Sequence, residues 1–104
     1  MALTKQFRLT VLERAHRDAS FRHALLAEAL NELLSGDIDV GKSLLRDYIN
    51  ATITFELLAN KLRKNSKSVQ RMLSTSGNPT TKSLMAIFHI LQKTEGIKIN
   101  IDIQ

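Results

Sequence analysis

The chain of 104 residues contains no cysteine and no tryptophan, and it has one proline, one tyrosine and four glycines. The lack of cysteine excludes disulfide bonds, thiol nucleophiles and cysteine-ligated zinc. No apolar run approaches the roughly 18 residues of a membrane span, and the charged N-terminal stretch is unlike a secretory signal. With few helix-breaking residues and many Leu and Ala, the sequence predicts one helical domain in the cytoplasm, with no membrane partner.

Acidic residues are missing from one long segment. Residues 57–94 carry seven basic residues and no acidic one, whereas residues 1–56 carry seven basic and eight acidic residues. The net charge of +5 is therefore concentrated in residues 57–94, the basic block. Such a block is either a solvated face or a surface for a polyanion. Nucleic acid, an anionic membrane and an acidic protein are all compatible partners.

Apolar residues recur with helical spacing along most of the chain, which predicts an all-α bundle of five to six helices. The first helix is expected over about residues 4–17, with an apolar stripe of Leu3, Phe7, Val11 and Ala15. The later helices are expected to begin at Asp18 or Ser20, Asp37 or Asp39, Thr54, Asn65, and Pro79 or Thr80. They should end near residues 34, 51, 62, 74 and 96.

The last residues follow a different period. Ile97, Ile99, Ile101 and Ile103 alternate with polar residues, the pattern of a strand with one apolar face. No other segment predicts a strand, so the backbone groups of residues 97–103 need a partner. We expect this strand to dimerise by pairing with its own copy in an antiparallel, two-fold homodimer. Pairing with a different protein and a frayed tail are the alternatives.

Two of the predicted helices, the fourth and the fifth, are short and joined by three residues inside the basic block. This is the layout of a DNA-binding helix-turn-helix. Ala59 lies ten residues before Val69, a separation seen in helix-turn-helix proteins, and its small side chain lets the helices cross closely. Arg63 and Lys64 stand where such turns usually carry a glycine and an apolar residue, so we expect a slightly different turn.

The outer face of the predicted fifth helix carries hydrogen-bonding side chains and no acid. In the major groove, Gln pairs with adenine and Arg with guanine. The expected base contacts are Lys67, Ser68, Gln70 and Arg71. The expected phosphate contacts are Lys61, Lys64, Asn65, Ser66, Ser74, Thr80, Thr81 and Lys82.

The sequence does not indicate catalytic chemistry. His16, His23 and His89 fall on three different predicted helices, with no two at metal-ligand spacing, and no glycine-rich phosphate loop occurs. We therefore predict no enzyme, no metal site and no cofactor. RNA binding is a weaker interpretation because the basic block has no aromatic residue before Phe88 to stack on bases.

Several stretches of the chain are similar to one known family. They are LRDYINAT (45–52), KSVQRMLS (67–74), SGNPTTKSL (76–84) and RDASFRHALLAEAL (17–30). On these stretches the chain resembles bacterial helix-turn-helix proteins called addiction-module antidotes or HigA-type antitoxins, of the wider xenobiotic-response-element, lambda-repressor-like group. The resemblance implies a homodimeric repressor on a pseudo-palindromic operator near its own gene, with a cognate ribonuclease-type toxin as a further partner. It also implies that Lys67, Ser68, Gln70 and Arg71 lie on the recognition helix.

The expected single domain, residues 1–104, comprises an N-terminal helical extension (1–50), a helix-turn-helix core (54–94) and the dimerisation strand. The extension exceeds what a minimal helix-turn-helix needs. It braces the core, extends the dimer or binds a partner, and its strong apolar stripes favour bracing. The rival interpretation is a protein-interaction antitoxin whose main role is to bind and neutralise a toxin. An exposed apolar patch on the extension would favour that interpretation.

Overall fold

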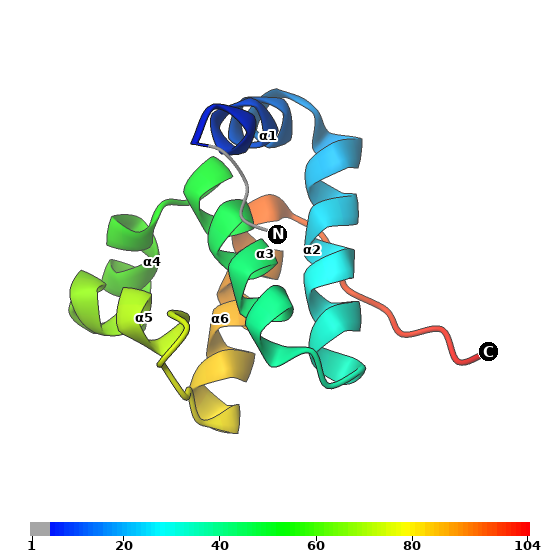
Figure 1. The fold of residues 1–104 in the computed structure, drawn as a ribbon. Helices are drawn as coiled ribbons and strands as arrows, with labels where there is room; N and C mark the ends of the chain where they lie inside the picture. The colour runs from blue at the N-terminus through cyan, green and yellow to red at the C-terminus, as the bar shows by residue number, and fades with distance from the viewer. Residues whose placement is uncertain (1–4) are drawn as a thin grey trace.

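The computed structural model describes residues 5–104, so Leu3 and Thr4 of the first predicted helix lie outside the described residues. Within this part the chain forms six helices and no strand, which confirms the all-α prediction. The helices are α1 Lys5–Arg17, α2 Ala19–Leu34, α3 Ile38–Ala51, α4 Phe55–Leu62, α5 Ser66–Met72 and α6 Thr81–Glu95. In Figure 1, α2 and α3 form a hairpin, α1 crosses its top, and α6 lies behind α3. The pair α4 and α5 lies on the side of α3 away from α2.

A side chain predicted from the sequence caps the start of each helix from α2 to α6. The caps are Asp18, Asp37, Thr54, Asn65 and Thr80, and each accepts a hydrogen bond from a first-turn amide. These bonds satisfy amides that have no partner inside the helix. Of the alternative starts, Ser20 and Asp39 lie inside the first turn of their helices, and Pro79 precedes the cap.

All the helices from α2 through α6 contribute side chains to one hydrophobic core. Its largest fully buried side chains are Tyr48, Leu26, Leu45, Ile49, Leu58, Leu73, Ile87, Leu91 and Val69. The core therefore draws on α2 and α3 as well as on the segment expected to form the helix-turn-helix. Burying one such aliphatic side chain stabilises a fold by about 1.5–3 kcal/mol, so this shared core fixes α4 and α5 on the α2–α3 hairpin.

Some apolar residues of the helices do not reach this core. Phe7 is 52% exposed and Leu34 is 65% exposed, and Val40 also lies at the surface. On α1 the one buried residue is Ala15. The stripe expected on the first helix is therefore only partly buried, because α1 crosses the end of the bundle instead of packing along it.

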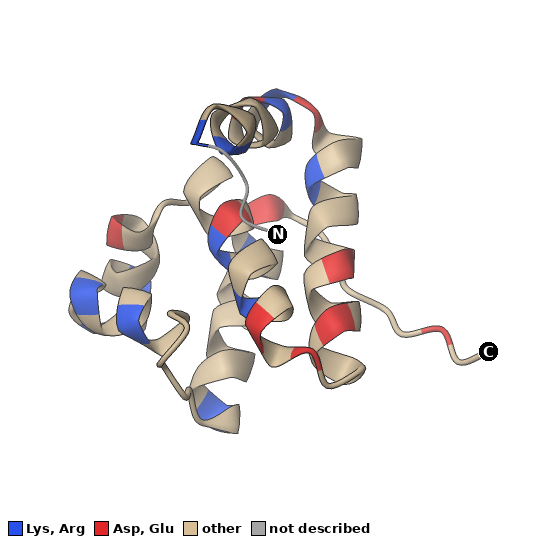
Figure 2. Cartoon of the chain, in the orientation of Figure 1, with Lys and Arg blue, Asp and Glu red and all other residues tan. Residues whose placement is uncertain are grey.

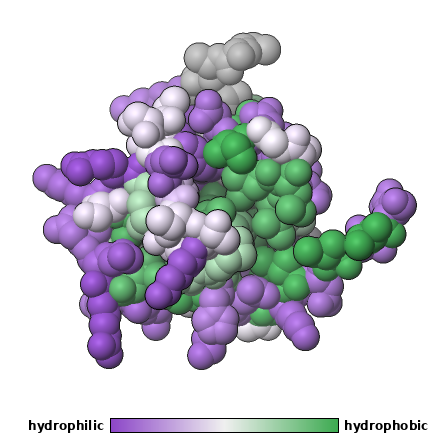
Figure 3. Space-filling view, turned by 90° about the horizontal axis from the view of Figure 1, so that it is seen from below, coloured by the Kyte–Doolittle hydropathy of each residue, from purple (hydrophilic) through white to green (hydrophobic). Residues whose placement is uncertain are grey.

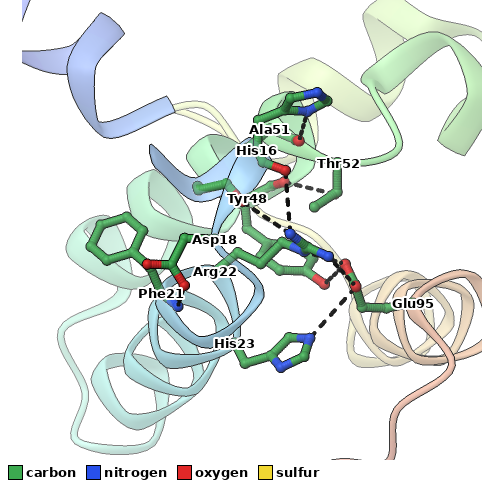
Figure 4. Close-up of polar contacts among 10 residues, drawn as sticks. His16, Asp18, Phe21, Arg22, His23, Tyr48, Ala51, Thr52 and Glu95 are labelled. Carbon is green, nitrogen blue, oxygen red and sulfur yellow. Dashed lines mark hydrogen bonds and ion pairs between the residues drawn. The ribbon is translucent and has the colours of Figure 1, made fainter. Parts of the chain in front are cut away.

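Glu95, the last residue of α6, joins α6 to α2 and α3 (Figure 4). Arg22 of α2 donates two hydrogen bonds of 3.0 Å to the two oxygens of this carboxylate. The hydroxyl of Tyr48 on α3 donates a third, also 3.0 Å long, and His23 Nε2 lies 3.5 Å away. The bonds from Arg22, and then the one from Tyr48, lower the pKa of Glu95 against the opposing effect of burial. This network fixes the point where the chain leaves α6.

The tail beyond α6 forms no strand within the described residues, so the predicted strand is not confirmed. A strand ladder needs a neighbouring strand, and one chain does not supply it. The amide of Ile97 donates to the carbonyl of Gln92 at 3.0 Å, and that of Ile99 donates to Gln92 Oε1 at 2.7 Å. Ile97 and Ile99 pack half-buried against the core, whereas Ile101 is 70% and Ile103 is 90% exposed.

Candidate nucleic-acid interface

Three residues, 63–65, turn the chain from α4 into α5. Arg63 adopts the left-handed conformation, with φ 57° and ψ 44°. Its amide donates to the carbonyl of Asn60 at 3.0 Å, and the amide of Lys64 donates to the carbonyl of Ala59 at 2.9 Å. This pair of bonds is the Schellman motif, which satisfies the last carbonyls of a helix and usually has glycine at the left-handed position. Arg63 therefore takes the left-handed conformation that glycine usually supplies at this position.

The backbone is also unusual where α4 begins. Thr54 has a φ of 72° and a ψ of 155°, a conformation that β-branched residues rarely adopt. Its amide donates to the carbonyl of Ile49 at 2.9 Å, and its hydroxyl accepts from the amide of Leu57. Strain of this kind costs about 1–3 kcal/mol and persists where the surrounding contacts impose it. Both ends of α4 thus carry non-glycine residues with a positive φ.

Small and aliphatic side chains pack α4 against α5. Leu58 and Ala59 of α4, together with Val69 of α5 and Leu73 just beyond it, are almost completely buried. Ala59 and Val69 are the two positions whose separation led us to expect close packing, and both belong to the core. Since this side of α5 is used for packing, its other side chains point outward.

The end of α5 is fixed by two cations of α3 that sequence reasoning missed. Lys42 is only 3% exposed, and its ammonium donates to the carbonyls of Ser74 and Gly77, both at 2.8 Å. Arg46 donates from Nη1 to the carbonyl of Leu73. Cations near a helix C-terminus satisfy its free carbonyls and its dipole. These two side chains therefore hold α5 and the following loop on α3.

The predicted fifth helix is two residues too long. It was expected to end at Ser74, but α5 ends at Met72. The amides of Leu73 and Ser74 donate to the carbonyls three residues earlier, in tighter turns than those of an α-helix. Gly77 then passes so close to α5 that a Cβ atom there would collide with the carbonyl oxygen of Arg71. A glycine at this position lets the loop fold back against the helix end.

An open groove runs along the outer side of α5. Three of the four expected base contacts, Lys67, Gln70 and Arg71, line this groove. Ser68 is exposed on α5 but does not line the groove. Gln70 Nε2 donates to the hydroxyl of Ser66 at 3.1 Å, which orients the amide and leaves its second N–H free to donate. The structure therefore brings hydrogen-bonding side chains together along one groove.

The expected phosphate contacts are spread over a wider surface. Ser74 lines the groove, and Ser66 and Asn65 lie at the start of α5. Asn65 uses its side-chain oxygen to accept from the amide of Lys67 at 2.8 Å. Besides Asn65, the exposed members that do not line the groove are Lys61 and Lys64 near the α4–α5 turn, and Thr80, Thr81 and Lys82 at the start of α6.

The charge distribution separates this side of the molecule from the opposite one. In Figure 2, Lys and Arg are the coloured residues on α5 and at the start of α6, whereas Asp and Glu gather on α2 and around the α2–α3 turn. The groove nevertheless contains one acid, Glu56 in the first turn of α4. Glu56 directly precedes the basic block in the sequence, so the absence of acids from residues 57–94 does not extend to the groove.

The groove has a second wall that the sequence analysis did not identify. Arg46 and Asn50 of α3 line it, together with Thr54, Phe55 and Glu56. Arg46 and Asn50 are four residues apart and so lie on one face of α3, beside its apolar stripe. That spacing is a signal in the sequence, but it lies outside the basic block, whereas the expected contacts all fall within residues 61–82.

Other kinds of site are not evident in the described part of the chain. No cluster of three His, Asp or Glu residues that suits a metal ion occurs among residues 5–104. None of the described helices has both the length and the apolar character needed to cross a bilayer. A scan of protein-family models, a search of curated proteins and a search of solved structures found no match to this chain.

Proposed function

We propose that the protein is a sequence-specific regulator of transcription that binds double-stranded DNA, with α4 and α5 as a lambda-repressor-like helix-turn-helix. The observation that carries this proposal is the groove along α5, where Lys67, Gln70 and Arg71 line the side formed by α5, a helix without an acidic residue. An α-helix is about 10–12 Å across with its side chains, and the major groove, about 12 Å wide, admits it. The outward side chains of α5 are those that read base edges.

The proposed roles follow from side-chain chemistry. Gln70, held by Ser66, suits adenine, and the guanidinium of Arg71 suits guanine. Lys67 and Ser68 are shared between bases and phosphates. The remaining cations and hydroxyls hold the backbone and set the position of α5 without reading sequence.

Glu56 restricts how a duplex can lie in the groove. It is the one acid among the described residues that line this surface. Its carboxylate repels phosphate, so we propose that a base edge faces it. The N4 amine of cytosine is the base group from which a carboxylate accepts a hydrogen bond.

The resemblance to addiction-module antidotes supports a more specific role, an antitoxin-like autorepressor that acts as a homodimer. A dimer would place two copies of α5 about 34 Å apart, facing successive major grooves of a pseudo-palindromic operator. The tail is the proposed dimerisation element, because its alternating isoleucines leave Ile101 and Ile103 uncovered in the single chain.

The test separates base contacts from backbone contacts. A binding site is first selected from a random duplex library with the unmodified protein. Arg71→Ala should weaken binding to that site by about 1–3 kcal/mol and relax the preference at one position. Lys82→Ala, the control at an expected phosphate contact, should weaken all duplexes to a similar extent. Unchanged affinity and preference in Arg71→Ala would show that α5 is not the recognition helix.

A second function, binding and neutralising a toxin, is favoured by one observation. Leu34, Ile38 and Val40 are exposed around the α2–α3 turn, where Asp37 and Asp39 also lie. Exposed apolar side chains within the N-terminal extension are the feature expected of a protein-binding surface. If the protein binds selected and scrambled duplexes equally weakly, this becomes the better proposal, and co-purification with the product of an adjacent reading frame tests it.

A further inference from the structure

The tail, residues 97–104, has hydrogen-bonded backbone amides on one edge and, in the described part of the chain, amides without a partner on the other. The amides of Ile97 and Ile99 donate to Gln92, so these two amides face α6. Within residues 5–104, the amides of Lys98, Asn100 and Asp102 donate no hydrogen bond. Amides alternate between the two edges of an extended chain, so the even-numbered residues face away from α6. The free edge of the tail therefore belongs to residues 98, 100 and 102.

If a second tail pairs along that edge, the charged side chains of the two tails are complementary. In an antiparallel pair centred on Asn100, Lys98 lies opposite the partner's Asp102, and Asp102 lies opposite the partner's Lys98. Residues 98 and 102 are equally distant from residue 100, and all three side chains point to the same face of the strand. We infer that a second copy of this chain pairs with the tail in this register, with Asn100 on the two-fold axis. The inference rests on the homodimer of the proposed function, but not on DNA binding.

The same register explains the pattern of burial along the tail. Ile99 lies opposite the partner's Ile101, and Ile97 lies opposite the partner's Ile103. Ile97 and Ile99 pack on their own core, together with Leu26 and Ala27 of α2. Ile101 and Ile103, which are exposed in the single chain, then extend over the corresponding surface of the second copy. Figure 3 shows apolar surface continuing from the body of the molecule onto the tail.

Self-complementarity favours a second copy over an unrelated strand. An unrelated partner would not require Lys98 and Asp102 to be symmetric about Asn100. Opposite charges directly across a pair of strands stabilise it, and like charges destabilise it. Each charged pair occurs twice in the dimer because of the two-fold axis. One substitution therefore changes two cross-strand contacts.

The first experiment is a charge exchange, measured by sedimentation equilibrium without DNA. Lys98→Asp alone and Asp102→Lys alone each place two like-charge pairs across the strands, and each should weaken dimerisation about tenfold or more. Mixed in equal amounts, the two variants should recover dimerisation, because both heterodimer pairs are again opposite in charge. A wild-type chain that stays monomeric, single variants that dimerise like wild type, or a mixture that does not recover would overturn the inference.

The second experiment tests the register by cross-linking, since the chain has no cysteine of its own. In the proposed ladder the two Asn100 residues form a hydrogen-bonded pair with Cα atoms about 5.5 Å apart, within the range for a disulfide. The two Lys98 residues would be separated by about 13 Å along the strands. Asn100→Cys should therefore form a disulfide-linked dimer on oxidation, and the control Lys98→Cys should not. Cross-linking of both variants would indicate a parallel pair and refute the register, whereas DNA binding stays open to its own test.

Discussion

Lys42 provides the sharpest test of how α5 is held in place. Replacement by Met keeps an apolar stem of about the same length and removes the ammonium group. The carbonyls of Ser74 and Gly77, each 2.8 Å from the ammonium, would then lose their donor. Among residues 5–104 its one ion-pair partner is Asp39, at 3.8 Å and largely exposed, so little is lost with that contact.

The expected magnitude follows from these two bonds. A hydrogen bond to a charged group contributes about 1.5–3 kcal/mol, and a buried carbonyl left without a donor costs about 1–3 kcal/mol. The gain from no longer burying an ammonium offsets part of this loss. We therefore expect Lys42→Met to lower the free energy of unfolding by about 2–4 kcal/mol.

Urea unfolding followed by circular dichroism measures this difference. With a typical m-value, the midpoint should fall by about 1–2 M while the slope stays unchanged. Lys61→Met, the same change at an exposed lysine of α4, should alter stability by less than about 0.5 kcal/mol. If Lys42→Met were as stable as Lys61→Met, the ammonium would not hold the end of α5, and the account of the loop would be wrong.

Two further predictions concern the frame around the site. The bonds from Arg22 lower the pKa of Glu95 in the folded protein, so ionised Glu95 stabilises the fold above its unfolded pKa of about 4.3. This contribution is lost as the pH falls through the folded pKa; the stability difference between wild type and Glu95→Gln should therefore be large at pH 7 and shrink towards pH 3. A difference that is constant with pH would contradict this role. Gly77→Ala should destabilise the fold by about 1–3 kcal/mol in thermal unfolding, because the new Cβ collides with the carbonyl of Arg71. Ser76→Ala, at its exposed neighbour, should have little effect, and equal stabilities would show that the loop moves freely.

Much of the fold could be predicted because it depends on local chemistry. Helix starts are set by Asp, Asn and Thr caps, and the apolar faces of α3 to α6 are set by spacing. The stripe on α1 was misjudged because periodicity shows which residues share a face but not whether another element covers that face. The tail differs for a related reason: the alternation of its isoleucines predicts a strand, but a strand forms only against a neighbour.

The candidate site was predicted where it depends on one helix and missed where it depends on tertiary contact. Lys67, Gln70 and Arg71 line the groove because they share one side of α5. Lys42 and Arg46 reach the end of α5 from a helix about 30 residues earlier, and no local pattern reveals such contacts. Both residues look like ordinary surface cations in the sequence.

DNA binding is most directly tested with the DNA upstream of the protein's own gene. Equilibrium binding to that duplex and to a scrambled duplex of equal length is measured over a series of salt concentrations. The account predicts that the upstream duplex is bound at least about a thousandfold more tightly, with an affinity that falls steeply and linearly on a logarithmic salt scale. Equally weak binding to both duplexes at every salt concentration would contradict the account. It would favour toxin binding through the exposed apolar side chains at the α2–α3 turn.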